Sequence, residues 1–286
     1  LVPEPGVKIT SYSLFRAPQP TYWRSDATED RLSAYARFLP VLVRAHWALW
    51  PGFELRLHHD DHARQHPYFP ALERMHHAGL LRLVACGEAR ALTLAMLWRM
   101  RPLFEEHDAL VLTCDLDALP VLRLRRCVDE FDASGKAVLC VHGCESHNGV
   151  MGGVFAARGG AFRRLVGARD FASFVALGRA GWDAYAADEE FLRTVVWPRV
   201  EEGSLLFSGN KPLMRCPDQR QAPSVPPPPD LHPEAVARGD DFAPYIGSAG
   251  YDLGAAFAHY DALPLPAQAL IRSCEGAVDL RQVMRL

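Results

Sequence analysis

The chain has 286 residues, of which 49% are hydrophobic and 23% charged, and its formal net charge is -3 at pH 7. This length and hydrophobic content suffice to bury a large core, so we expect a folded chain rather than a disordered one. Because no run of Lys or Arg forms a basic stripe that could neutralise phosphates, the composition argues against a nucleic-acid-binding protein.

No stretch of the sequence approaches roughly 18 consecutive apolar residues, and residues 1–6 lack a basic region followed by an apolar one. We therefore expect no integral membrane segment. Three of the seven cysteines, Cys86, Cys114 and Cys140, lie inside apolar runs, where they would behave as small buried hydrophobes. This usage suits a reducing compartment and predicts a cytoplasmic protein.

The first predicted strand covers residues 7–13 and ends in Ser11, Tyr12 and Ser13. In a parallel sheet these three residues would reach the edge where ligands bind, and a ring with two hydroxyls could meet a nucleobase. The alternative is that they are ordinary strand-end residues. A helical pattern over residues 29–49 follows and stops at a Pro-Gly pair.

Strands and helices then alternate along the chain. The second strand, residues 53–59, has period two and carries Asp60 at its tip, where it is a candidate ligand contact. Helical patterns and apolar runs continue in turn over residues 71–79, 80–85, 89–104, 109–114, 123–131 and 137–141. This rhythm predicts an α/β fold with a mainly parallel sheet flanked by helices.

The strand predicted at residues 109–114 is unbroken in apolar character and is followed by Asp115, Leu116 and Asp117. Such a strand is buried on both faces, and in open α/β sheets ligands bind beyond the carboxyl ends of the strands. Side chains at i and i+2 of an extended segment point the same way, and paired carboxylates suit Mg2+ or Mn2+. One such tripeptide is expected by chance in a chain of this composition, so a solvated strand end is the alternative.

A polar, glycine-rich stretch over residues 142–153 precedes another apolar strand. Its glycines would let backbone approach a ligand, and the side chains of His147 and Asn148 can hydrogen-bond one. A zinc site built on His142, Cys144 and His147 is disfavoured, because no second spaced pair completes a tetrahedral set.

Helical patterns follow over residues 158–178 and 184–196, and a short strand begins at residue 204. Asp188 falls in the first turn of the second helix, where the helix dipole is a sufficient structural reason for an acidic residue. Lys211 sits in a turn after the short strand, where it could meet a diphosphate or be an ordinary surface lysine. A Pro-rich connection at residues 222–230 and a helical tail after about residue 255 complete what we expect to be a single domain over residues 1–286.

Taken together, these stretches resemble GT-A (Rossmann-like) nucleotide-sugar glycosyltransferases, in layout similar to the glycogenin and galactosyltransferase group and to viral and bacterial relatives. The resemblance covers about residues 7–215 and depends on the first strand with Tyr12, the pair Trp98-Arg99, the acidic pair Asp115 and Asp117, the segment Asn148-Gly149-Val-Met, and Asp188-Glu-Glu-Phe-Leu.

The resemblance implies roles for these positions. Arg99 would lie near the sugar-nucleotide, Asn148 and Gly149 would line the sugar pocket, and Asp188 would face donor or acceptor, so Asn148 and Asp188 are the candidate catalytic residues. The donor would also meet residues at the other strand ends and turns, namely Ser11, Tyr12, Ser13, Asp60, Leu116 and Lys211, with the metal held by Asp115 and Asp117.

One departure concerns the third metal ligand. The family often has a histidine just before the motif G-x-x-K-P-W, whereas here Leu206 stands in that place and the motif is shortened to Gly209-Asn-Lys-Pro-Leu213. The third ligand therefore stays open, with Asp218 and His232 as weak candidates.

The expected function is metal-dependent transfer of a sugar from a nucleoside-diphosphate donor to a glycan or another hydroxyl acceptor. UDP and retention of configuration are favoured by the resemblance only, and GDP or dTDP donors remain open. The rival enzyme is a haloacid-dehalogenase-like phosphatase with Asp115 as nucleophile, disfavoured because three strand-helix units precede the motif and Leu119 stands where Thr or Val is expected. A non-catalytic nucleotide-sugar-binding domain is the third possibility.

Overall fold

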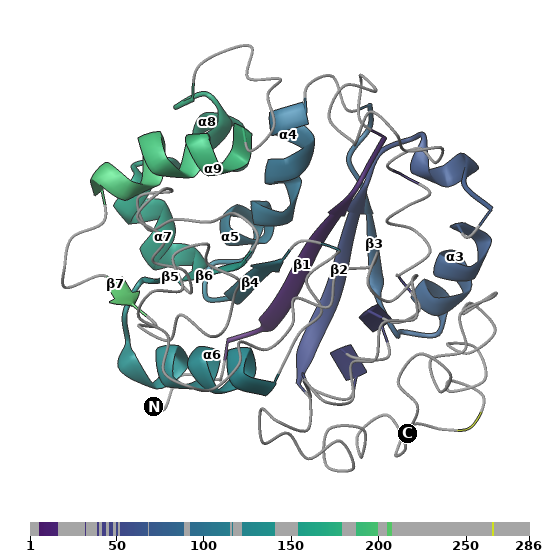
Figure 1. Ribbon diagram of the computed structural model, residues 1–286, viewed down its shortest axis with the longest axis horizontal. Coiled ribbons are helices and arrows are strands. Elements are labelled where there is room, and N and C mark those ends of the chain that lie inside the picture. Colours follow the sequence, from purple (N-terminus) through teal and green to yellow (C-terminus); the bar gives the residue numbers. More distant parts are fainter. Residues whose placement is uncertain are drawn as a thin grey trace, which may run out of the picture.

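The computed structural model describes residues 6–16, 32, 39, 42–43, 46–47, 50, 52–67, 69–88, 92–114, 116, 122–140, 154–178, 187–199, 205–207 and 265. Over this part of the chain, strands and helices alternate in the order that the apolar periodicity predicts. The prediction of an α/β fold is confirmed (Figure 1).

Within the described residues, one sheet contains seven strands in the order β3-β2-β1-β4-β6-β5-β7. Their bounds are β1 Lys8–Leu14, β2 Phe53–His59, β3 Arg82–Ala85, β4 Leu110–Cys114, β5 Val138–Cys140, β6 Val154–Arg158 and β7 Leu205–Phe207. The pairs β1 with β2, β1 with β4, β2 with β3, and β5 with β7 are parallel. Only β6, among these strands, runs antiparallel to its neighbours β4 and β5. The sheet is therefore mixed and mainly parallel, as expected.

The described helices flank the sheet, and several are shorter than the sequence patterns suggested. They are α3 Phe69–His77, α4 Leu92–Leu97, α5 Pro102–Glu105, α6 Leu122–Ser134, α7 Gly159–Val166, α8 Phe171–Val175 and α9 Ala187–Phe191. The short helices are η2 Ala63–Gln65, η3 Trp98–Met100, η5 Leu192–Val196 and η6 Trp197–Arg199. Leu32, Leu39, Leu42, Val43, His46 and Trp47 are also helical, within the pattern expected at residues 29–49.

Two predicted helices are interrupted in the structure. The helix expected at residues 89–104 is divided into α4, η3 and α5, and Pro102 starts the last of these because proline lacks the N–H that a helix interior needs. The helix expected at residues 158–178 ends at Gly167, whose φ of 70° is left-handed, and restarts at the capping box of Asp170 and Ser173.

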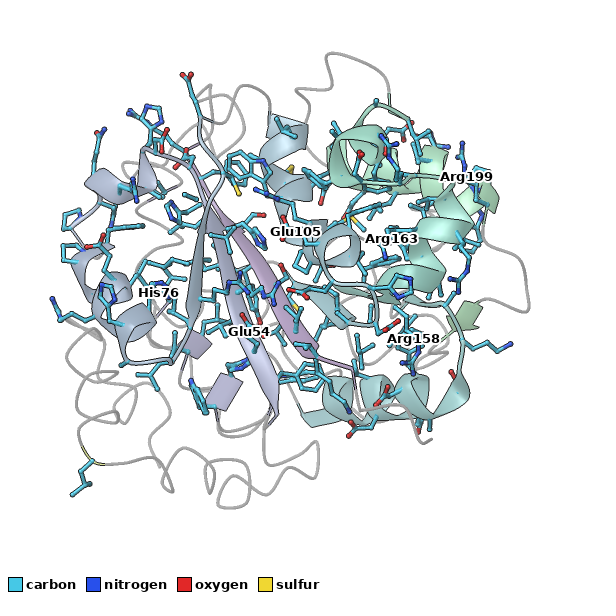
Figure 2. The ribbon with its side chains drawn as sticks, turned by 180° about the vertical axis from the view of Figure 1, so that it is seen from behind. Glu54, His76, Glu105, Arg158, Arg163 and Arg199 are labelled. Carbon is cyan, nitrogen blue, oxygen red and sulfur yellow. The ribbon has the colours of Figure 1, made fainter. Side chains whose placement is uncertain are left out.

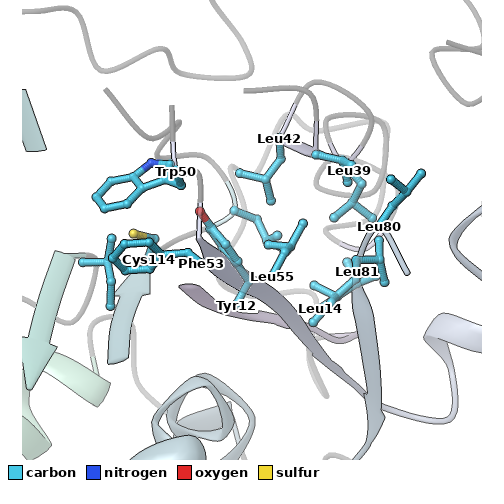
Figure 3. Close-up of a cluster of buried hydrophobic side chains, with 14 of the residues drawn as sticks. Tyr12, Leu14, Leu39, Leu42, Trp50, Phe53, Leu55, Leu80, Leu81 and Cys114 are labelled. Carbon is cyan, nitrogen blue, oxygen red and sulfur yellow. The ribbon is translucent and has the colours of Figure 1, made fainter. Parts of the chain in front are cut away.

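The core consists of two large hydrophobic clusters, one on each face of the sheet. The first joins the sheet to α3, α6 and the helical residues between Leu32 and Val43, and includes Leu57, Leu72 and Phe131. Tyr12 and Leu14, which belong to the same cluster, are labelled in Figure 3. The second joins the sheet to α5, α7, α8, α9 and η5, and includes Ile9, Val111, Phe155, Phe162 and Phe174. Alternation along each strand sends successive side chains to opposite clusters.

An ion-pair clamp closes the amino edge of the sheet. Asp132 of α6 accepts from Lys8 Nζ at 2.7 Å and from an Arg158 Nη2 at 2.8 Å, joining the start of β1 to the end of β6. Arg158 lies beside α6 in Figure 2. Burial alone would raise the pKa of Asp132, but the two cations lower it below its ordinary value.

The opposite, carboxyl edge collects the ends of four parallel strands, at Leu14, His59, Ala85 and Cys114. The antiparallel β6 begins at this edge, because its Val154 pairs with Cys114. Strand β5 also ends there, since its Cys140 pairs with Phe155. The chain between β5 and β6 therefore leaves and re-enters the sheet at the edge where ligands bind in folds of this class.

Candidate functional site

Arg99 and Asp188, 89 residues apart in the sequence, form a buried ion pair. The Arg99 Nη2 donates to the Asp188 Oδ2, and the two side chains are only 6% and 4% exposed. The Arg99 Nη1 also donates to the carbonyl oxygen of Cys114 at 3.4 Å. Since Cys114 is the last residue of β4, the guanidinium lies at the carboxyl end of that strand, one residue before Asp115.

The main chain of Arg99 is held separately. Its backbone N–H donates to the Ser13 Oγ at 3.0 Å, and Ser13 lies next to the end of β1. Trp98 and Met100, on either side of Arg99 in η3, are buried. Elements β1, η3, β4 and α9 therefore meet around one arginine.

A buried ion pair of this kind has a clear chemical capacity. A guanidinium presents several N–H donors in a plane that matches the oxygens of a phosphate, and a carboxylate accepts from hydroxyl groups. Because Asp188 balances the charge of Arg99, the pair adds no net charge that would repel a cation nearby. The same pair could also be purely structural, since breaking a buried ion pair leaves an uncompensated charge and destabilises a fold.

Asp60 lies at the carboxyl edge as expected, but its contacts in the described residues are with the chain itself. Its Oδ2 accepts from the backbone N–H of Arg16 at 2.9 Å, and its Oδ1 accepts from that of Ala63 at 2.7 Å. The side chain is fully buried. Asp60 thus ties the end of β1 to η2, which shapes the edge.

Ser11 and Tyr12 are buried between the layers. Tyr12 lies in the first hydrophobic cluster beside Trp50, Phe53 and Cys114 (Figure 3), and burial together with the Cys114 thiol raises the pKa of its hydroxyl well above the ordinary value. The Ser11 Oγ lies 3.3 Å from the His58 Nδ1. Both side chains are fully buried among the described residues, and their contact with a ligand stays a prediction.

The acidic pair itself lies outside the described residues, as do Asn148, Gly149 and Lys211. Leu116, between the two aspartates, is described: it is 5% exposed and packs in the first cluster with Cys114. Its observed contacts are therefore with the core, although it was expected to meet the donor. No group of three or more His, Cys, Asp and Glu side chains that could hold a metal occurs in the part of the chain that the structure describes.

The sequence did not predict the contacts of two residues at this edge, Ser13 and His58. Ser13 was expected to contact a ligand, yet it holds the backbone of Arg99. His58 was not singled out; it is fully buried, and burial, followed by the Arg101 charge, lowers its pKa to about 3. The burial of His58 could have been predicted from the period of two along β2. His58 lies on the face of the strand opposite to Leu57, and that face is also covered.

No protein-family description matches the chain. No curated protein matches it. Among solved structures, a mannosyltransferase from Pyrobaculum calidifontis in complex with GDP-Man and Mn2+ matches over 94% of this chain and 79% of that chain, with 15% sequence identity and a TM-score of 0.39. Likeness at this level assigns neither a family nor a ligand to the chain. In the described residues, no helix is long and apolar enough to cross a membrane.

Proposed function

We propose that the chain is a metal-dependent glycosyltransferase that moves a sugar from a nucleoside-diphosphate donor to a hydroxyl group of a glycan or another acceptor. The observation that carries the proposal is the Arg99 guanidinium, fixed by Asp188 and by the Cys114 carbonyl at the carboxyl end of β4. The sequence continues from that point into Asp115 and Asp117. Guanidinium N–H donors for a phosphate and two carboxylates for a metal would thus meet at the end of one strand.

The chemistry requires charge stabilisation at the leaving group. When the bond between the sugar C1 and the diphosphate oxygen breaks, its electron pair stays on the diphosphate, and the acceptor hydroxyl passes its proton to the departing diphosphate or to water as the new bond to C1 forms. Mn2+ or Mg2+ bound by Asp115 and Asp117 would neutralise part of that charge. Arg99 would donate to the phosphate oxygens, and Lys211 is the further candidate cation.

Asn148, Gly149 and Asp188 would contact the sugar and determine which sugar is bound. The segment that carries Asn148 and Gly149 is attached to the sheet at Cys140 and Val154, both at the carboxyl edge. Asp188 reaches the same edge through its bond to Arg99. Uracil is the first candidate base and retention the first candidate outcome, both by resemblance.

The test is calorimetric titration with UDP, GDP and dTDP, with and without Mn2+. We expect Mn2+-dependent binding of at least one of them, and in Asp115→Asn and in Asp117→Asn a loss of at least about tenfold in the affinity measured with Mn2+ only, because each variant removes one charged oxygen ligand. Asp108→Asn is the matched control: Asp108 flanks the other end of β4 with its side chain 81% exposed, and its loss should leave affinity unchanged. Undiminished affinity in both site variants would reject the metal site.

Turnover separates the remaining functions. Release or transfer of sugar from the nucleotide-sugar whose nucleotide binds best supports the glycosyltransferase. Binding with no turnover in the presence of acceptor sugars supports a binding domain, and hydrolysis of simple phosphomonoesters without nucleotide preference supports a phosphatase.

A further inference from the structure

We propose that Ser13 is a positioning residue that acts on a diphosphate ligand through Arg99 and does not itself touch the ligand. The identity of the ligand rests on the function proposed above. The geometry behind it is the bond from the Arg99 backbone N–H to the Ser13 Oγ, 3.0 Å long, which links η3 to β1 across 86 residues of sequence.

Arg99 is held at two separate points. Ser13 fixes its main chain, whereas Asp188 and the Cys114 carbonyl fix its guanidinium. A paired contact to phosphate oxygens depends on the orientation of the guanidinium plane, which the first anchor controls through the side-chain stem. By accepting a hydrogen bond from the backbone N–H of Arg99, the Ser13 hydroxyl thus orients the Arg99 guanidinium.

An aromatic contact next to this hydrogen bond also connects the end of β1 to η3. Phe15, two residues after Ser13, packs edge to face on Trp98 with ring centroids 6.3 Å apart and an interplanar angle of 85°. Trp98 immediately precedes Arg99, and both rings belong to a small buried cluster with Ala95. The end of β1 and the residue that follows it therefore hold η3 by one hydrogen bond and one aromatic contact.

The first experiment is a double-mutant cycle on ligand affinity. The probe is whichever of UDP, GDP and dTDP the wild type binds with Mn2+. Ser13→Ala should weaken it about threefold to tenfold, the loss expected for one hydrogen bond, and should cause no further loss when added to Arg99→Ala. Ser13→Thr keeps the hydroxyl and should restore affinity. Equal losses from Ser13→Ala in both backgrounds would mean direct contact with the ligand and would overturn the proposal.

Ser173→Ala is the matched control. The Ser173 Oγ also accepts a backbone N–H, that of Asp170, at 3.0 Å, and Ser173 is half-buried like Ser13. The control variant lies in the cap of α8, so it should lower stability without changing affinity. A comparable loss of affinity in Ser173→Ala would show that general destabilisation explains the effect of Ser13→Ala, which also overturns the proposal.

The second experiment needs no ligand. Urea unfolding of Ser13→Ala, Asp188→Asn and the double variant measures whether the two anchors of Arg99 depend on each other. We expect the double variant's unfolding constant to differ at least about threefold from the product of the single effects, and Ser173→Ala to combine with Asp188→Asn without such a difference. If the wild type binds no nucleotide, the proposed function fails, but this cycle still decides whether Ser13 positions Arg99. Independent effects of Ser13→Ala and Asp188→Asn would reject that role.

Discussion

His58 is a fully buried imidazole of β2. Its Nδ1 lies 3.3 Å from the Ser11 Oγ and 3.3 Å from the Tyr12 carbonyl oxygen. Burial is the largest cause of its low pKa, and the charges of Arg101, Arg56 and His59 add to it. Protonation of this ring would place a positive charge near the guanidinium groups of Arg101 and Arg56, which is unfavourable.

The fold should therefore lose stability in mild acid. With a pKa of about 3 in the folded state, against an ordinary value near 6.5, His58 stays neutral while the unfolded chain takes up a proton. Its contribution is intact above pH 6.5 and declines by about 1.4 kcal/mol per pH unit as the pH falls toward 3. His59, whose pKa is also lowered chiefly by burial, adds a decline of the same sign.

The measurement is urea unfolding between pH 7 and pH 4 of the wild type and of His58→Asn, which keeps a hydrogen-bonding side chain but does not titrate. The free energy of unfolding should fall less steeply with acid in the variant. Parallel pH profiles for the two proteins would show that His58 does not titrate differently in the folded and unfolded states.

At the scale of single residues, the sequence identified which side chains reach the carboxyl edge better than it identified their partners. Arg99 and Asp188 were both expected at the site, and the structure brings them into contact. Their mutual bond could not be predicted, because the two residues are 89 positions apart in the sequence and the fold of the chain between them decides it. Asp60 and Ser13, both predicted ligand contacts, accept hydrogen bonds from backbone amides, a use of a side chain that no local pattern reports.

Among the elements, the contact between α5 and α7 is set by a glycine. A Cβ added to Gly159, the first residue of α7, would lie 2.3 Å from the Glu106 carbonyl oxygen, which is backbone and cannot move aside alone. The next residue, Gly160, is less restricted, since its added Cβ would come no closer than 3.0 Å to the His107 ring and 3.1 Å to the His107 carbonyl oxygen.

Gly159→Ala should therefore destabilise the protein by about 1–3 kcal/mol, the cost typical of overpacking, although alanine is the better helix former. Gly160→Ala serves as the graded comparison and should cost less, because its added Cβ lies at 3.0 Å or more from its neighbours, against 2.3 Å for Gly159. Thermal or urea unfolding gives both values. A Gly159→Ala protein as stable as the wild type would mean that α5 and α7 can separate at no cost.

The order of the elements was predictable, whereas their breaks and directions were not. Period two in residues 53–59 and the apolar run at 110–114 identify strands because one or both of their faces are buried. The apolar pattern crosses Pro102 and Gly167 without change, so two helices looked continuous. Nor does periodicity encode direction, and the antiparallel course of β6 becomes visible only from its register with β4.

At the scale of the whole molecule, one sheet contributes side chains to both large hydrophobic clusters, one cluster on each face. Leu110 and Leu112 face the first, and Val111, between them, faces the second. Neither cluster can lose its strands without uncovering the other. We therefore expect the chain to unfold as a single domain, in keeping with the length of the sequence.

The expected result is one cooperative transition in urea. Trp50 lies in the first cluster and Trp197 packs against the second, so tryptophan fluorescence samples both faces while circular dichroism follows the helices. The two signals should change at the same urea concentration. Two separated transitions would divide the chain into independent units.

The antiparallel strand β6 also has a consequence for how such a molecule can diversify. Residues 141–153 join neighbouring strands at two fixed points, Cys140 and Val154, both on one edge. Lengthening a connection between fixed ends costs little, about 0.6 kcal/mol for each doubling. The length and side chains of this segment can therefore change while the hydrogen-bond ladder of the sheet remains as it is, and under the function proposed above such changes would alter the choice of sugar.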